Sequence, residues 1–207
     1  MPTFNAADFK VFDLDGFKPR MDEIRTRIRP RLEAIGTRLA PAIAHATGGE
    51  TFPHVARHAR RTVNPPDDTW VAFAPDARGY KKHNHFKVAV SRHCVRFLFE
   101  AGPEHADKKR FATAWRKNAP RLGPVLRRVK GLAWFKNEHD EDPAAALGDM
   151  SPEVFADLAD ELTRTREGQL VVGRAVPSTE VTRLTDAECR EMAASTFRAL
   201  APLYRLR

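Results

Sequence analysis

The sequence is poor in cysteine and has no long apolar run. Its two cysteines, Cys94 and Cys189, lie far apart in segments with apolar periodicity. This placement argues against a disulfide framework and against a paired-cysteine metal motif, and it fits a reducing compartment. No apolar run approaches the roughly 18 residues of a membrane helix, and the first residues lack a secretory pattern. We therefore predict a cytoplasmic protein that has no membrane partner.

Several familiar enzyme motifs are also missing. The sequence contains no P-loop, no G-x-G-x-x-G motif after a predicted strand, no G-x-S-x-G elbow and no C-x-x-C pair. The common signatures of nucleotide binding, serine hydrolysis and thiol redox chemistry are thus absent. A function has to be inferred from other residues.

Acidic residues are scarce in the middle of the chain. Residues 54–130 carry eighteen Lys and Arg against six Asp and Glu, whereas residues 131–207 carry nine against fourteen. The formal net charge is +8. Such an asymmetry draws anionic partners to one side of a protein. The alternative interpretation is that these charged residues simply cover ordinary solvated surfaces. The same alternative applies to the basic run at 108–130.

The length and the apolar content are typical of one domain, with 207 residues of which 42% are hydrophobic. Apolar residues recur every three or four positions over 21–43, which predicts a helix that Pro30 and Pro41 kink or break. Arginines within it splay around its surface and are interpreted as solubilising: Arg25, Arg27, Arg29 and Arg31. Further helices are predicted at 104–118, ending before Pro120, at 125–129, after an N-cap at Ser151 and after a capping box at Thr185.

Segments rich in β-branched and aromatic residues predict five strands. They lie at residues 69–74, 85–90, 94–101, 132–136 and 169–176. Short connections join the first three into an antiparallel meander, whereas the order of the last two stays open. The expected fold class is therefore α+β, a single domain whose mainly antiparallel sheet of about five strands is covered by helices.

The segment FPHVARHARRTVNPPDDTWVAFAPDARGYKKHNHF, residues 52–86, resembles the YktB family of uncharacterised bacterial proteins. The family segment combines the blocks FPHVA, HARR, VNPP, DTWVAFA and RGYKK, and each block occurs here. IRP at 28–30 and ALAPLY at 199–204 also resemble family segments, while His83 and Asn84 depart from the family pattern. The resemblance implies a cytoplasmic α+β domain with no assigned activity, so it transfers no catalytic residue to this chain.

The same segment contains the candidate ligand site. A cluster of His and Arg precedes a stiff Asn-Pro-Pro turn, and a second basic group follows the first strand of the meander. Arg binds phosphate oxygens with two parallel hydrogen bonds, Lys supplies a point charge, and Gly79 permits close backbone approach. We expect both groups to converge on an anionic ligand or nucleic acid. The candidates are His54, Arg57, His58, Arg60, Arg61, Arg78, Tyr80, Lys81 and Lys82.

The conformation of residues 54–61 is left open by the pattern. Only a helix would gather His54, Arg57, His58 and Arg61 on one face, since a strand divides them. The spacing of the two histidines also fits zinc, completed by His85, Asp67 or Asp68. Because the Glu of H-E-x-x-H is missing and arginines crowd the site, a cation is disfavoured and we expect no metal and no cofactor.

Three classes of function remain. The first is the binding of a phosphate-bearing ligand or nucleic acid, in which Trp70, Phe73, Tyr80 and Phe86 either stack on bases or belong to the core. The second is an enzyme that acts on a phosphorylated substrate with His54 or His58 as acid or base. The third is a protein-interaction module, whose partner the sequence does not indicate.

Overall fold

An antiparallel sheet forms the centre of the structure, which is a computed structural model that describes residues 3–206. Within those residues the sheet has seven strands in the order β1-β2-β3-β4-β7-β5-β6. The strands are β1 (Phe52–Val55), β2 (Asp68–Ala74), β3 (His85–Ser91), β4 (Cys94–Ala101), β5 (Ala133–Phe135), β6 (Ala145–Ala146) and β7 (Leu170–Pro177). The predicted meander is confirmed, because β3 pairs antiparallel with both β2 and β4.

The expected number of about five strands is wrong, because β1 and β6 add two short strands at the edges of the sheet. β1 has the sequence FPHV, in which a proline and a histidine interrupt the apolar pattern, and β6 consists of two alanines. Neither carries the β-branched run that marks a strand. They form because β2 and β5 each offer a free row of backbone hydrogen-bonding groups. The α+β fold class is as predicted.

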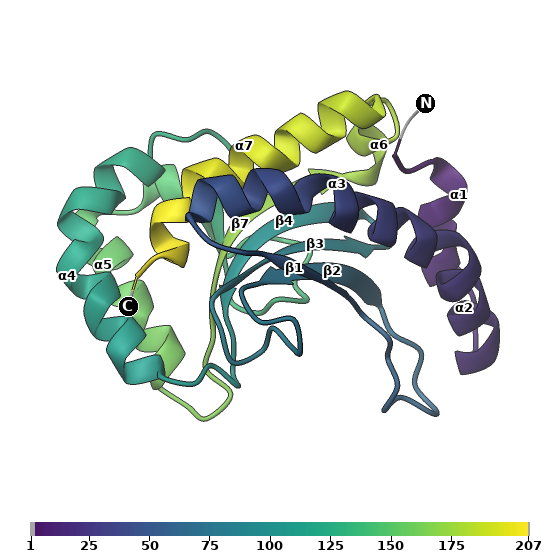
Figure 1. Cartoon of the computed structure of the whole chain (residues 1–207), viewed down its shortest axis with the longest axis horizontal. Coiled ribbons are helices and arrows are strands. Elements are labelled where there is room, and N and C mark those ends of the chain that lie inside the picture. Colours follow the sequence, from purple (N-terminus) through teal and green to yellow (C-terminus); the bar gives the residue numbers. More distant parts are fainter. Residues whose placement is uncertain (1–2, 207) are drawn as a thin grey trace.

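Helices cover one face and both ends of the sheet. They are α1 (Ala6–Phe9), α2 (Phe17–Glu23), α3 (Arg29–Thr47), α4 (Lys108–Leu126), α5 (Pro152–Thr163), α6 (Ser178–Val181) and α7 (Asp186–Tyr204), with 3₁₀ turns at Lys10–Asp13 and Leu147–Asp149. Figure 1 shows α3 and α7 side by side across one face, α4 and α5 at one end, and α1 and α2 at the other. The N-caps predicted at Ser151 and Thr185 are confirmed, since each side chain accepts a backbone N–H three residues on.

The helix predicted over residues 21–43 is interrupted as the prolines suggest. A π-helical turn, Ile24–Ile28, separates α2 from α3 and directly precedes Pro30. Proline cannot donate to the carbonyl four residues back and its ring clashes with it, so the wider turn accommodates Pro30. Pro41 lies inside α3 without ending it. Apolar contacts along α3 hold the helix across this second proline.

The predicted end of α4 before Pro120 is wrong. One helix runs from Lys108 to Leu126 and contains both Pro120 and Pro124, so no separate helix forms at 125–129. Its apolar face packs on α5, where the Trp115 indole N–H donates to the Phe155 carbonyl oxygen at 2.9 Å. This tertiary packing outweighs the cost of two prolines, which local sequence rules alone treat as breakers.

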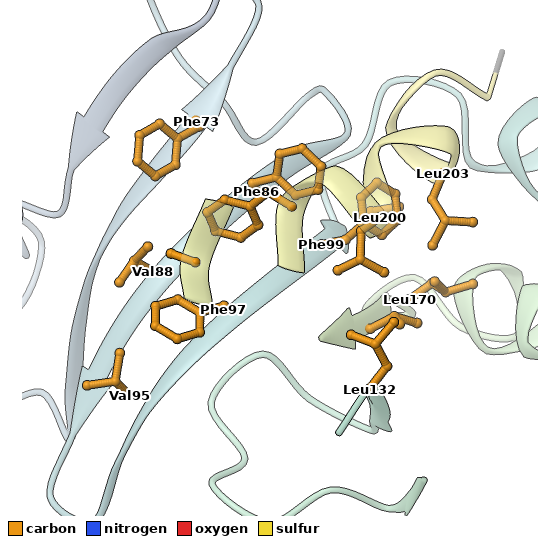
Figure 2. Close-up of a cluster of buried hydrophobic side chains, with 14 of the residues drawn as sticks. Phe73, Phe86, Val88, Val95, Phe97, Phe99, Leu132, Leu170, Leu200 and Leu203 are labelled. Carbon is orange, nitrogen blue, oxygen red and sulfur yellow. The ribbon is translucent and has the colours of Figure 1, made fainter. Parts of the chain in front are cut away.

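Aromatic side chains fill the core between the sheet and the helices. Phe73, Phe86, Phe97 and Phe99 project from β2, β3 and β4 toward α7, as Figure 2 shows. Phe197 of α7 stacks on Phe86 with a ring-centroid distance of 4.7 Å. The interpretation of Phe73 and Phe86 as core residues is therefore correct. Phe residues of this size contribute about 3 kcal/mol each when fully buried.

The opposite face of the meander is polar and nevertheless buried. Side chains alternate along strands, so every second residue of β2, β3 and β4 points away from α3 and α7. In Figure 1 the loops between strands lie on this side of the sheet. The buried polar residues here are Asp68, His85, Lys87, Ser91, Arg96 and Glu100. Within residues 3–206, no helix is both long enough and apolar enough to cross a bilayer.

Replacing Phe197 with Ala should lower the free energy of unfolding by about 3–5 kcal/mol, because it opens a cavity among three aromatic rings. Urea unfolding monitored by circular dichroism measures the change. Val154→Ala on the exposed face of α5 is the matched control, and it should alter the free energy by less than about 0.5 kcal/mol. Equal effects of the two substitutions would contradict this assignment of the core.

Candidate functional site

Residues 52–61 form a strand and a loop, so the helical alternative is wrong. β1 ends at Val55, and residues 56–67 connect it to β2 without a helix. The His54 Nε2–H donates to the Asp76 carbonyl oxygen at 2.9 Å. His58 has a left-handed backbone with φ of 50°. Its Nε2 lies 3.1 Å from Thr69 Oγ1. The two histidines thus have different partners, and among the described residues no group of three or more His, Cys, Asp or Glu is placed to hold a metal ion.

A cavity of about 640 Å³ lies between α3, β1 and the loop at residues 75–84. Gly36 lets α3 lie close to β1, because a Cβ at this position would come within 2.9 Å of the Pro53 Cβ. Four of the residues predicted from the sequence line this cavity, which we name the β1 cavity: His54, Arg57, Arg78 and Tyr80. Arg29, which the sequence analysis interpreted as a solubilising residue, lines it as well.

The other predicted residues lie outside the β1 cavity. The Arg61 guanidinium donates to the Pro65 carbonyl oxygen within its own loop at 3.4 Å. His58 packs edge-on against the Trp70 ring, 5.3 Å between centroids. Arg60 is exposed on the same loop. Lys81 and Lys82 line a neighbouring cavity of about 490 Å³, which shares Arg78 and Tyr80 with the β1 cavity.

Positive charge in the β1 cavity is only partly neutralised. Arg29 Nε lies 3.2 Å from Glu33 Oε1. Arg78 Nε lies 3.6 Å from Asp76 Oδ1, and its side chain is 94% exposed. Arg57 has no carboxylate within ion-pair distance among residues 3–206. The cavity can therefore accept an anion without displacing a strong internal ion pair.

Tyr80 and His54 form the wall of the β1 cavity. Tyr80 Oη accepts a hydrogen bond from the Trp70 indole N–H at 3.0 Å. Burial raises the pKa of Tyr80 to about 12, so at neutral pH its hydroxyl keeps a proton to donate. Burial lowers the pKa of His54, which stays neutral. Because its Nε2–H donates to Asp76, its Nδ1 is left as an acceptor.

A buried layer of charges lies directly behind this wall. The Tyr80 ring meets the His85 ring edge-on at a centroid distance of 4.9 Å. Lys87 Nζ lies 2.8 Å from Glu100 Oε2. It also pairs with Glu138 and lies 4.7 Å above the Trp70 ring. Sequence reasoning missed this layer, although a Lys within the apolar strand HFKVAV was a signal for it.

A second ion pair continues the layer toward β4. Arg96 Nη2 donates to Asp68 Oδ2 at 2.6 Å. His139 Nδ1 lies 3.0 Å from both oxygens of the same carboxylate. Glu138 and His139 belong to the loop that follows β5. The ion pairs attach that loop to the polar face of the meander.

Opposite charges decide the ionisation of the buried acids. Burial alone would raise the pKa of Glu100, but the charges of Lys87 and His85 outweigh it and hold that pKa well below its ordinary value. Burial also disfavours ionised Asp68, yet the hydrogen bond from His139 and the charge of Arg96 lower its pKa. Both carboxylates are therefore ionised at neutral pH. The ion-paired layer supports the wall of the β1 cavity.

Replacing Glu100 with Gln should cost about 3–5 kcal/mol of unfolding free energy, because Lys87 and His85 lose their shared buried anion. Urea unfolding at pH 7 measures the loss. Glu104→Gln is the control, since its pair with Lys81 is exposed and worth less than about 1 kcal/mol. A variant Glu100→Gln as stable as this control would show that the buried layer adds no stability.

The stability of the protein should also fall in acid. The lowered folded-state pKa values of Glu100 and Asp68 mean that the unfolded chain binds more protons below about pH 5, and this favours unfolding. The contribution is fully present above the ordinary carboxyl pKa and is lost as the pH falls. Urea midpoints measured from neutral pH to pH 3 test the effect. The decline should be shallower in Glu100→Gln, and an unchanged decline would assign it to other carboxylates.

Comparison with known proteins places the chain in a family. A family model described as a domain of unknown function (DUF1054) matches residues 4–204. The chain is 33% identical over 197 residues to a UPF0637 protein of Lysinibacillus sphaericus, covering 95% of this chain and 92% of the relative. It is 32% identical over 203 residues to a UPF0637 protein of Bacillus velezensis, covering 98% and 95%. The chain therefore belongs to this uncharacterised bacterial family, and the resemblance of its sequence to the YktB family is confirmed.

Proposed function

We propose that the protein binds a small phosphate-bearing ligand in the β1 cavity. The observation that carries the proposal is that Arg57 and Arg78, from two separate loops, line one cavity and are poorly neutralised there. Arg is the side chain best suited to grip phosphate oxygens through two parallel hydrogen bonds. A volume of about 640 Å³ is also typical of small-molecule sites.

The residues of the cavity that the sequence predicted each have a chemical role in this proposal. Arg57 and Arg78 bind the phosphate oxygens, and the backbone at Gly79 faces open space, since no atom lies within 4 Å of a Cβ built there. The Tyr80 hydroxyl donates a hydrogen bond to the ligand. The free Nδ1 of His54 accepts one from a ligand hydroxyl. The ion-paired layer behind the wall keeps Tyr80 and His54 in place.

The distribution of the basic residues favours a compact ligand over a long nucleic acid. The loop at 56–67 and helix α4, where the basic run at 108–130 begins, lie at opposite ends of the molecule in Figure 1. A nucleic acid would have to cross the intervening loops to contact both the 56–67 loop and helix α4. The exposed Arg60 and Arg61, which have no carboxylate partner among residues 3–206, support a single strand bound to one loop as the second candidate.

An enzyme would use the same cavity with His54 as its base. His54 is neutral, and its unbonded Nδ1 is available as a proton acceptor. His58 is less suitable, because burial lowers its pKa to about 4 and its Nε2 already contacts Thr69. Binding of the anion comes first in either case, so the test addresses binding.

The double variant Arg57→Ala with Arg78→Ala should weaken the binding of pyrophosphate at least about tenfold, because two charge-assisted contacts are lost. Isothermal titration calorimetry measures the affinity at low salt. Arg25→Ala with Arg27→Ala is the control, since it removes the same charge from surface residues that pair with Asp22 and Glu23. Equal affinity of both double variants would refute the β1 cavity as the site.

The same proteins should be titrated with a labelled single-stranded oligonucleotide at several salt concentrations. The proposal expects binding weaker than that of pyrophosphate, with a shallow salt dependence. Each phosphate neutralised on a single strand adds about 0.7 to the log-log salt slope. A steep slope that Arg60→Ala with Arg61→Ala abolishes would instead establish nucleic acid as the ligand.

A further inference from the structure

A second cavity lies on the other side of the 75–84 loop and shares no lining residue with the β1 cavity. Its volume is about 580 Å³. It is formed where the end of α3 at Gly48, the start of α4 at Asp107 and the end of α7 at Tyr204 meet. In Figure 1 these elements converge at the end of the molecule that carries the C-terminus. We name it the α7 cavity.

Three basic residues lie at the mouth of the α7 cavity. Lys82, Arg110 and Arg205 line it, and none lies within ion-pair distance of a carboxylate in the described part of the chain. Their neighbours differ, since Lys81 pairs with Glu104 at 2.6 Å and Arg116 pairs with Asp160. Like charges gathered in one hollow repel one another, so an anion bound among them gains electrostatic energy.

Two carboxylates, Glu50 and Asp107, also line the cavity and offset part of this charge, so three cations and two anions leave a formal net charge of +1. Asp107 Oδ1 accepts the Arg110 backbone N–H at 2.9 Å, which makes this side chain the N-cap of α4. The Asp107 backbone N–H donates to His105 Nδ1 at 3.1 Å. The proton of His105 is therefore on Nε2, where it is available as a further donor. Burial lowers the pKa of His105 and keeps the ring neutral.

Two residues that line the cavity, Asn84 and Tyr204, carry buried polar atoms without partners. Asn84 is 9% exposed, and its Nδ2 donates to the carbonyl oxygens of Tyr204 and Leu206 at 3.2 and 3.4 Å. Its Oδ1 is buried and unpaired, as is the Tyr204 hydroxyl. An unpaired buried acceptor costs about 1–3 kcal/mol. A ligand that donates an N–H to Asn84 would remove this cost.

Aromatic rings lie beside these polar atoms. Phe111 and Tyr204 both line the cavity, and Tyr204 stacks on Phe86 with ring centroids 5.1 Å apart. Burial raises the pKa of Tyr204 to about 12, so its hydroxyl remains protonated. A planar ring with N–H groups fits such surroundings, because its face packs on aromatic carbon while its edge forms hydrogen bonds.

We propose that the α7 cavity is a second ligand site, specific for a nucleoside monophosphate. The phosphate is bound by Lys82, Arg110 and Arg205 at the mouth. The base lies beside Phe111 and Tyr204, and an N–H on its edge donates to Asn84 Oδ1. This proposal is independent of the β1 cavity, since the two sites have different walls and different cations.

Adenosine 5′-monophosphate is the probe for this site, and its affinity is measured by isothermal titration calorimetry. Lys82→Ala with Arg110→Ala should weaken its binding at least about tenfold. Lys109→Ala with Lys117→Ala is the control, because it removes the same charge from the same region outside the cavity. Similar losses in the two double variants would mean non-specific attraction and would overturn the proposal.

The interior is tested with ribose 5-phosphate and inorganic phosphate. Both should bind at least about tenfold more weakly than adenosine 5′-monophosphate, because they leave Asn84 Oδ1 unpaired. Tyr204→Phe keeps the ring but removes the unpaired hydroxyl. It should weaken the binding of the nucleotide and leave the binding of the other two ligands unchanged. If inorganic phosphate binds as tightly as the nucleotide, the cavity accepts a simple anion and the assignment fails.

Arg57→Ala with Arg78→Ala separates the two sites. This variant should keep the wild-type affinity for adenosine 5′-monophosphate, because neither residue lines the α7 cavity. A loss of nucleotide binding in it would place the nucleotide in the β1 cavity and overturn the second site. Pyrophosphate binding measured on the same samples should fall, because the cations of the β1 cavity are removed.

Discussion

The pairing of Lys87 with Glu100 is the constraint on which the polar half of the structure depends. Both side chains are almost fully buried on the face of the sheet opposite α7. An isolated charge is very costly there, so each ion needs the other and each needs further partners. His85 donates to Glu100, Glu138 pairs with Lys87, and the Trp70 ring covers the ammonium group. The sheet is thus held by apolar contacts on one face, and on the other by these ion pairs beside a small apolar cluster that includes Leu98 and Phe135.

This ionic face explains how long loops become part of the fold. Glu138 and His139 are brought over the sheet by the charges of Lys87 and Asp68, and Tyr80 is fixed by hydrogen bonding to Trp70 and by packing on His85. Loops are normally the most mobile and variable parts of a domain. Here their inner side chains are tied to rigid strands, and this gives the hollows beside them defined walls.

The apolar half of the fold was largely predictable from the sequence. Regular spacing marks α3, capping residues mark the starts of α5 and α7, and β-branched runs mark the meander. Failures occurred where contacts distant in sequence outweigh local preference. α4 continues through Pro120 because it packs on α5, and β1 forms around Pro53 because β2 offers a partner.

The candidate site was predictable only in part, because it too depends on contacts between residues distant in sequence. The concentration of basic residues around Arg57 and around Arg78 predicted a ligand site, and residues of both groups line the β1 cavity. Composition cannot show that Arg29 also lines the β1 cavity or that Lys82 lines the α7 cavity. Both facts depend on how the helices are placed in space. Asn84 stood out in the sequence only as a departure from the family pattern, because its unpaired oxygen becomes a feature only after burial.

The shortness of the edge strands has a consequence for the protein in a crowded cell. A long, regular edge presents a row of free N–H and C=O groups that can recruit a second sheet and start aggregation. β1 has four residues, one of them the N–H-lacking Pro53, and β6 has two. Neither offers enough consecutive donors to template a foreign strand. The sheet therefore ends in two edge strands that are too short to pair with another sheet, and this protects the chain from open-ended polymerisation.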